Sequence, residues 1–126
     1  MRILLDTHLL LWWLSASPSL SVEASEMIRD PANMVFVSAV SLWEIWLKES
    51  LGKLRVPADF TDRLAAEDFE SLPLTASQTR RVATLPWHHR DPFDRMLIAQ
   101  AQFESLVLLT GDETLAVYGS VVRLAR

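Results

Sequence analysis

The chain has 126 residues, of which 50% are hydrophobic, a formal net charge of −4 and no cysteine. This length predicts a single domain with its own core, and the absence of cysteine excludes disulfides and zinc fingers. The acidic balance argues against a protein that binds nucleic acid through a basic surface alone, although bound divalent cations can still recruit phosphates to an acidic chain.

The first strand is expected almost at the N-terminus, at residues 3–5. The opening MRILLDTHLLLWW imitates a signal peptide, but Asp6 and His8 interrupt its apolar stretch. The uninterrupted run at residues 9–14 is far too short to cross a bilayer. We therefore expect no membrane segment and, because cysteine is absent, a cytoplasmic protein.

Short apolar runs without alternation predict strands that are buried on both faces of a parallel sheet. They lie at residues 3–5, 35–37 and 106–109, with edge strands expected at 72–74 and 121–124. Helical patterns alternate with them at residues 9–14, 21–29, 41–51, 59–69, 77–84 and 92–104. This order predicts a three-layer α/β/α sandwich with a central, mainly parallel sheet, formed by residues 1–126 as one domain.

Four acidic residues fall at the ends of these elements. Asp6 and Asp112 follow two of the buried strands, Glu44 lies early in the helix after residues 35–37, and Asp94 lies in the first turn of the helix at 92–104. Ligands of open α/β sheets bind outside the carboxyl ends of the strands, so all four border the same edge. Converging carboxylates need a cation, and oxygen ligands suit Mg²⁺ or Mn²⁺. The expected chemistry is phosphodiester hydrolysis.

Most of these acids also have a purely structural explanation. Asp6 fits the N-cap of a helix, and Asp112 fits a turn before a short helix. Glu44 completes the capping box that begins at Ser41 and lies four residues before Lys48, a favourable helical ion pair.

The segment HHRDPFDRMLIAQA, residues 88–101, carries two aspartates where one capping residue would suffice. Asp91 fits the N-cap, followed by a proline at the first helical position. Asp94 shares a helical face with Leu97 and Ile98, so it is expected to face the protein. We therefore assign Asp91 to the turn and Asp94 to the acidic site.

Basic residues surround this segment. Arg90 and Arg95 are expected to pair with the two aspartates or to reach phosphates, and Arg95 falls off the apolar face of the helix, as do Gln102 and Gln100. The three histidines, His8, His88 and His89, are expected to make local hydrogen bonds in loops, because water can serve as the base.

The chain has five tryptophans, two of them adjacent. Trp12 and Trp13 are not expected to face the same core, since neighbouring residues on a helix point in different directions. One of them belongs either at a protein interface or under a neighbouring element, and the sequence leaves both possibilities open.

Four blocks together resemble a known family: LLDTHLLLWW, VSAVSLWEIWLK, HHRDPFDRMLIAQA and LLTGDETLAVYG. Through them the chain resembles the PIN-domain family and, within it, the VapC-type toxin ribonucleases of bacterial toxin–antitoxin modules. The resemblance spans nearly the whole chain and implies a PIN-like α/β fold and an RNA substrate. It also implies that the catalytic residues, which bind Mg²⁺ or Mn²⁺, are Asp6, Glu44, Asp94 and Asp112.

The resemblance further implies a homodimer and an antitoxin whose segment covers the acidic pocket. It supplies polar neighbours of the acids, Thr7, Ser41 and Thr110, whose hydroxyls would orient carboxylates or water; hydroxyl residues at helix entries also serve as caps.

Three alternatives remain at this point. A catalytically silent PIN-like binding module would share the fold. A receiver-like signalling domain would gather acids around Mg²⁺, but it would need paired acids after the first strand. A hydrolase with an aspartyl nucleophile would need a second aspartate at position 8, where His8 stands.

Overall fold

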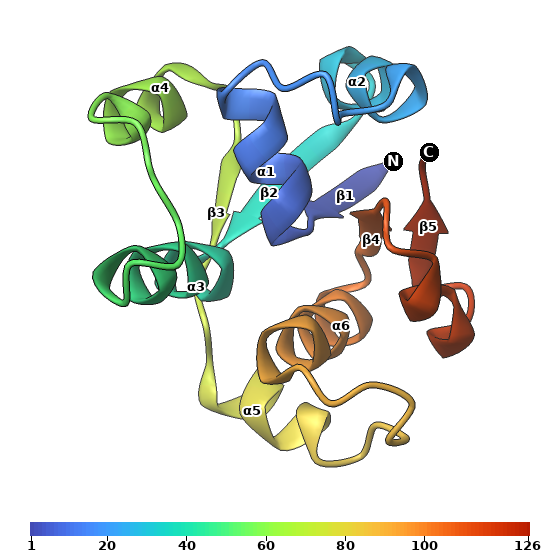
Figure 1. The fold of residues 1–126 in the computed structure, drawn as a ribbon. Helices are drawn as coiled ribbons and strands as arrows, with labels where there is room; N and C mark the ends of the chain where they lie inside the picture. The colour runs from blue at the N-terminus through green and yellow to red at the C-terminus, as the bar shows by residue number, and fades with distance from the viewer.

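The computed structural model describes residues 1–126 and contains one five-stranded sheet (Figure 1). The strands are β1 (Arg2–Leu5), β2 (Met34–Ser38), β3 (Glu70–Leu72), β4 (Val107–Thr110) and β5 (Val122–Leu124). Their order is β3-β2-β1-β4-β5, and every neighbouring pair is parallel. The predicted parallel sheet is confirmed, with the two short strands at its edges.

Helices cover both faces of the sheet. They are α1 (Thr7–Leu14), α2 (Val22–Arg29), α3 (Ala39–Ser50), α4 (Phe60–Ala66), α5 (Ala76–Val82), α6 (Pro92–Glu104) and the short 3₁₀ helix η1 (Glu113–Tyr118). Figure 1 shows α1, α2 and α4 on one side of the sheet and α5 and α6 on the other, so the predicted three-layer sandwich is confirmed. None of these helices has both the length and the apolar character needed to span a membrane.

The two helical layers use opposite faces of the same strands. Ile3 and Leu5 of β1 belong to the core under α1 and α2, whereas Leu4 belongs to the core with Leu97 and Ile98 of α6. Successive strand residues point to opposite faces, and burial of both faces explains why the apolar runs show no alternation. It also fixes the register, and with it the point where β1 ends at the acidic edge.

The start of α3 differs from the prediction. Its N-cap is Ser38, whose hydroxyl accepts a hydrogen bond from the backbone two residues on at 2.9 Å. Ser41 lies inside the helix, fully buried, and accepts a hydrogen bond from the Thr7 hydroxyl at 3.0 Å. The predicted capping box between Ser41 and Glu44 is therefore wrong, because the helix begins directly at the end of β2.

Two other boundaries lie nearer the N-terminus than predicted. The helix predicted at residues 59–69 ends at Ala66, because Glu67 adopts extended backbone and leads into β3. The edge strand predicted at residues 72–74 lies at Glu70–Leu72, and Pro73, which has no N–H to donate to a ladder, stands just beyond it.

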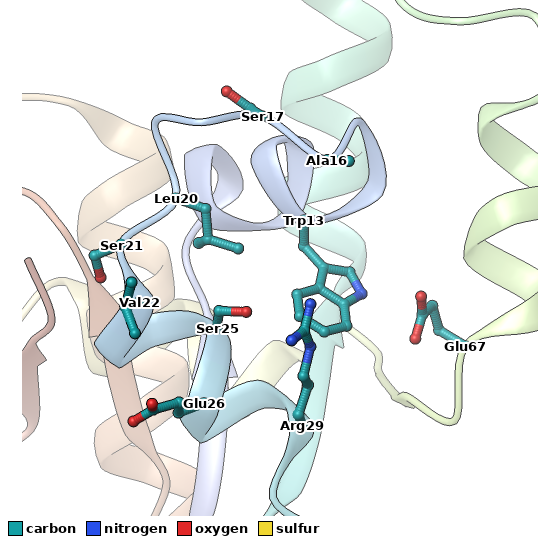
Figure 2. A pocket seen from close by; sticks show the side chains of 10 residues that line it. All are labelled: Trp13, Ala16, Ser17, Leu20, Ser21, Val22, Ser25, Glu26, Arg29 and Glu67. Atoms are coloured by element: carbon teal, nitrogen blue, oxygen red, sulfur yellow. The ribbon is translucent and has the colours of Figure 1, made fainter.

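The adjacent tryptophans both pack against the core under α1, which corrects the expectation that they could not share one. Trp13 lines a groove of about 480 Å³ beside α2, where the Arg29 guanidinium lies 5.5 Å from the centre of its ring. Figure 2 shows these two side chains together, and it shows Glu67, the residue directly after α4, across the groove from them. Trp12 instead lines a cavity beside Asp6.

A buried polar network joins α6 to its neighbours. Gln100 is fully buried, contrary to the expectation that it would fall off the apolar face. It accepts a hydrogen bond from the Ser38 hydroxyl at 2.5 Å and donates one to Gln78 at 3.0 Å, and Gln78 donates to Glu104 at 3.0 Å. The network connects the end of β2 with α5 and α6.

Replacing Gln100 with leucine is expected to lower the free energy of unfolding by about 1–3 kcal/mol, because the buried Ser38 hydroxyl would lose the acceptor of its proton and Gln78 would lose one of the two donors to its Oε1. Urea denaturation of the two proteins measures the difference. Gln102→Leu is the matched control, since that side chain is only half-buried, and it should change stability by less than about 0.5 kcal/mol. An unchanged stability for Gln100→Leu would contradict the expectation.

Candidate active site

The four predicted acids lie where neighbouring strands end. Asp6 follows β1 and Asp112 follows β4, which pair directly in the centre of the sheet. Glu44 lies in α3, which follows β2, and Asp94 lies in the first turn of α6. All three of the other acids raise the pKa of the Asp94 carboxyl, so the four belong to one electrostatic cluster.

Thr110 links the two aspartates that follow β1 and β4. Its hydroxyl donates to Oδ2 of Asp6 at 2.5 Å and accepts a hydrogen bond from the backbone N–H of Asp112 at 3.0 Å. Asp6 is only 4% exposed, and its Oδ1 accepts the backbone N–H of Leu9 at 2.8 Å as the N-cap of α1. Both oxygens of Asp6 are therefore held in place.

Asp112 also acts as a cap. Its Oδ1 accepts hydrogen bonds from the backbone N–H and the hydroxyl of Thr114, at 3.0 and 2.7 Å, and so begins η1. The structural explanations of Asp6 and Asp112 are thus confirmed, but each cap uses one oxygen. The second oxygen of Asp112 takes no part in the cap.

The two aspartates of the DPFD segment divide as predicted. Oδ1 of Asp91 accepts the backbone N–H groups of Phe93 and Asp94, at 2.8 and 3.3 Å, and caps α6. The Asp94 side chain is 20% exposed and takes no part in the cap. Nε2 of His89 lies 3.8 Å from Oδ2 of Asp94.

Glu44 is held from one side only. Its Oε2 accepts a hydrogen bond from Nζ of Lys48 at 2.5 Å, which confirms the predicted ion pair. The Glu44 side chain is 3% exposed, and its Oε1 is buried without any hydrogen-bond partner. Burying a carboxylate oxygen without a partner lowers the stability of the fold, so we expect this atom to bind a ligand.

Burial and repulsion together perturb the titration of the cluster. Burial, followed by the charges of Asp91, Asp6, Glu44 and Asp112, raises the pKa of Asp94 to about 7. Burial also raises the pKa of Asp6, although its hydrogen bonds from Thr110 and Leu9 oppose this. The pKa of Lys48 is raised mainly by its hydrogen bond to Glu44. The protein thus holds carboxylates together without enough positive charge to balance them.

These residues fit a divalent cation. Carboxylate oxygens of Asp94 and Asp112 lie within 4.8 Å of each other beside the ring of His89, and the charge of Glu44, whose Oε1 has no partner, acts on Asp94. Carboxylate oxygens are the ligands that Mg²⁺ and Mn²⁺ prefer, and a cation would offset the repulsion that raises the pKa of Asp94.

His89 is the residue whose position the sequence did not predict. Its Nδ1 accepts the backbone N–H of Asp91 at 3.1 Å, so the local hydrogen bond that we expected is present. In the neutral ring the proton must then lie on Nε2, which faces Asp94. The only signal in the sequence is its place just before the DPFD segment.

The expectation for Arg95 is wrong. Its guanidinium is 4% exposed and contacts neither aspartate; it donates to the backbone carbonyls of Pro86, Val82 and Leu85, at 2.9 to 3.4 Å, and to the Tyr118 hydroxyl at 3.3 Å. The last residue of α5 and the loop between α5 and α6 supply these carbonyl acceptors. Because the same Tyr118 hydroxyl accepts the backbone N–H of His89, Arg95 helps to hold the loop that carries this histidine.

Comparisons with known proteins point to one family. A family model described as PIN domain matches residues 3–120. Ribonuclease VapC22 of Mycobacterium tuberculosis is 32% identical over 116 residues, which cover 90% of this chain and 88% of that protein.

Solved structures add support for the fold alone, because their sequence identity is low. VapBC2 of Rickettsia felis, bound to a DNA fragment from its promoter, has a TM-score of 0.73 at 15% identity and covers 98% of both chains. VapBC-5 of Mycobacterium tuberculosis, from the VapBC family of toxin–antitoxin systems, has a TM-score of 0.62 at 22% identity, covering 99% of this chain and 98% of that one.

Without divalent cations, the free energy of unfolding is expected to fall as the pH rises from about 4 to about 7. Between the ordinary aspartate pKa of 3.8 and the raised pKa of about 7, the folded protein binds the Asp94 proton more tightly than the unfolded chain does. The loss from this group is on the order of a few kcal/mol. Denaturation of wild type and Asp94→Asn in EDTA across this range measures it, and the asparagine variant should show a flatter profile. Identical profiles would contradict the assignment.

Proposed function

Because the chain belongs to the PIN-domain family, we propose that it is a metal-dependent endoribonuclease and the toxin of a toxin–antitoxin pair. One observation carries the proposal: four carboxylates share one electrostatic cluster, in which burial and the charges of its neighbours, Asp6, Glu44 and Asp112 among them, raise the pKa of Asp94. Such a cluster binds a cation or remains destabilised. The name of the relative, ribonuclease VapC22, supports RNA as the substrate.

We assign the cation, Mg²⁺ or Mn²⁺, to Asp6, Glu44, Asp94 and Asp112. A divalent cation held there would neutralise the carboxylates, polarise the scissile phosphodiester and lower the pKa of an attacking water. This role also explains how RNA approaches an acidic protein, since the cation supplies the positive charge that the chain lacks.

The acidic residues differ in how firmly hydrogen bonds hold their side chains. Thr110 and the backbone of Leu9 fix both oxygens of Asp6, which makes it a rigid anchor. Asp94 is not restrained by a cap, so it can adjust to the phosphate and to water. The Nε2–H of His89 faces the same space and can donate a hydrogen bond to a phosphate oxygen.

The family assignment excludes two of the alternative functions. A receiver-like domain and an aspartyl-nucleophile hydrolase are different folds or chemistries from the PIN domain matched over residues 3–120. A silent PIN-like module would share the fold, and metal-dependent cleavage distinguishes it from the nuclease proposed here.

The toxin role implies two protein partners. The structural neighbours VapBC2 and VapBC-5 belong to toxin–antitoxin systems, which supports an antitoxin partner for this chain. We also propose a homodimer. Its contact would use the exposed apolar side chains of α3 and of its C-cap residue, since exposed apolar side chains that cluster are typical of interfaces; they are Trp43, Trp46, Leu47 and Leu51.

Purified protein is expected to cut RNA into discrete products with Mn²⁺ or Mg²⁺ and to cut nothing in EDTA. Asp6→Asn and Asp94→Asn should each lower the cleavage rate by roughly 100-fold or more, because each removes a charge that holds the cation. Gel analysis of total RNA checks this, with circular dichroism to verify folding. Undiminished cleavage by both folded variants would exclude the assigned site, and cleavage in EDTA would exclude metal dependence.

In bacteria, induced expression of the wild-type chain alone is expected to arrest growth, whereas Asp94→Asn should not. The control is an immunoblot that shows equal amounts of both proteins. Growth arrest by both would mean that the effect does not depend on the acidic site, and arrest by neither would count against the toxin role.

A further inference from the structure

A cavity of about 270 Å³ lies beside the acidic cluster. It is lined by Asp6, His8, Trp12, Gly111 and Asp112. Two of these residues are carboxylates that we assign to the cation, while the aromatic residues come from α1. The cavity is slightly below the range of about 300–1,000 Å³ that holds whole small ligands, so it suits one part of a larger substrate.

The aromatic wall of the cavity is ordered before any ligand binds. Trp12 is half-buried and packs against the core under α1. His8, one helical turn earlier, lies with its ring centre 5.9 Å from that of Trp12 at an angle of 46°. Packing restricts the Trp12 ring, so little conformational entropy remains to be lost when a planar group stacks on it.

Gly111 leaves space beside Trp12 on the side of the cavity formed by the turn between β4 and η1. A Cβ added at Gly111 would lie 3.9 Å from Cζ3 of Trp12 and 3.7 Å from the carbonyl oxygen of Ala125. A side chain at this position would therefore contact the indole ring, whereas glycine leaves that space open. A flat group that enters here would meet an aromatic ring and the backbone of this turn, next to two carboxylates.

We propose that this cavity binds the nucleobase of a nucleotide that neighbours the scissile phosphate. The inference rests on the proposed nuclease function and extends it by naming where the substrate is gripped. A phosphate would be repelled by Asp6 and Asp112 unless it lay on the cation, whereas an uncharged base can stack on Trp12. With a net charge of −4, the chain needs such uncharged contacts to hold RNA.

The larger groove beside α2 carries no such inference. Trp13 and Arg29 form its aromatic and basic part (Figure 2), but none of the four acids lines it. Trp13 therefore offers a matched control: like Trp12 it is a half-buried indole on α1 that packs against the same core, and it faces a different hollow.

The test compares an RNA oligonucleotide that wild-type protein cuts once with two versions that are abasic on either side of the cut bond. One abasic version should be a poorer substrate for wild type by about 10-fold or more, the effect of one lost stacked base. Trp12→Leu should lower kcat/KM on the intact RNA by a similar factor and have little further effect on that abasic version. Trp12→Phe should restore most of the loss, and Trp13→Leu should leave the base dependence unchanged.

Several outcomes would overturn the inference. One is a wild-type enzyme that cuts intact and abasic RNA equally, and another is a Trp12→Leu defect of the same size on both substrates, which would indicate a structural role. His8→Ala, at an exposed position, keeps the test valid if Trp12→Leu does not fold, and it should weaken the same base dependence. Calorimetric binding of the intact and abasic oligonucleotides to Asp94→Asn protein gives a readout that does not need cleavage. Equal affinities there would refute the base site even if the proposed nuclease function itself failed.

Discussion

Repulsion among buried carboxylates is the constraint on which the rest of this structure depends. Asp6, Glu44 and Asp94 are largely withdrawn from water, and burial, followed by the charges of Asp91, Asp6, Glu44 and Asp112, raises the pKa of Asp94 to about 7. Such an arrangement opposes folding unless the surrounding structure is stable enough to impose it. The stability comes from the sheet, whose central strands are buried on both faces and so end at fixed points. The acidic edge is the consequence of that register.

The protein holds this cluster with the ordinary chemistry of helix ends. Asp6 and Asp112 cap α1 and η1 with one oxygen each, and Thr110 bridges the two residues. Asp91 caps α6, so the Asp94 side chain takes no part in the cap. Capping and ligand binding are thus compatible uses of the same residues, because a carboxylate has two oxygens and several lone pairs. A structural explanation for an acidic residue does not exclude a catalytic one.

A second feature is that the loop between α5 and α6 is fixed by a buried cation that does not belong to the acidic cluster. Arg95 is saturated by backbone carbonyls and by Tyr118, and its guanidinium lies 3.7 Å from the centre of the Trp87 ring. Tyr118 in turn holds the backbone of His89. An ion pair between Arg95 and the aspartates would have neutralised the site. Its engagement elsewhere leaves the carboxylates available for a cation.

The sequence alone determined the elements and their order, because apolar periodicity and capping residues are local signals. It gave the parallel sandwich, the bounds of the helix at residues 92–104 and the inward direction of Asp94, all of which follow from the spacing of residues along one element. It also located the four acids, since the ends of parallel strands converge on one edge. Only the tertiary structure decided which distant residues each helix and strand contacts. Ser38 rather than Ser41 caps α3, Arg95 is buried, and Trp12 and His8 border a cavity beside Asp6, because these outcomes depend on distant segments that no local pattern specifies.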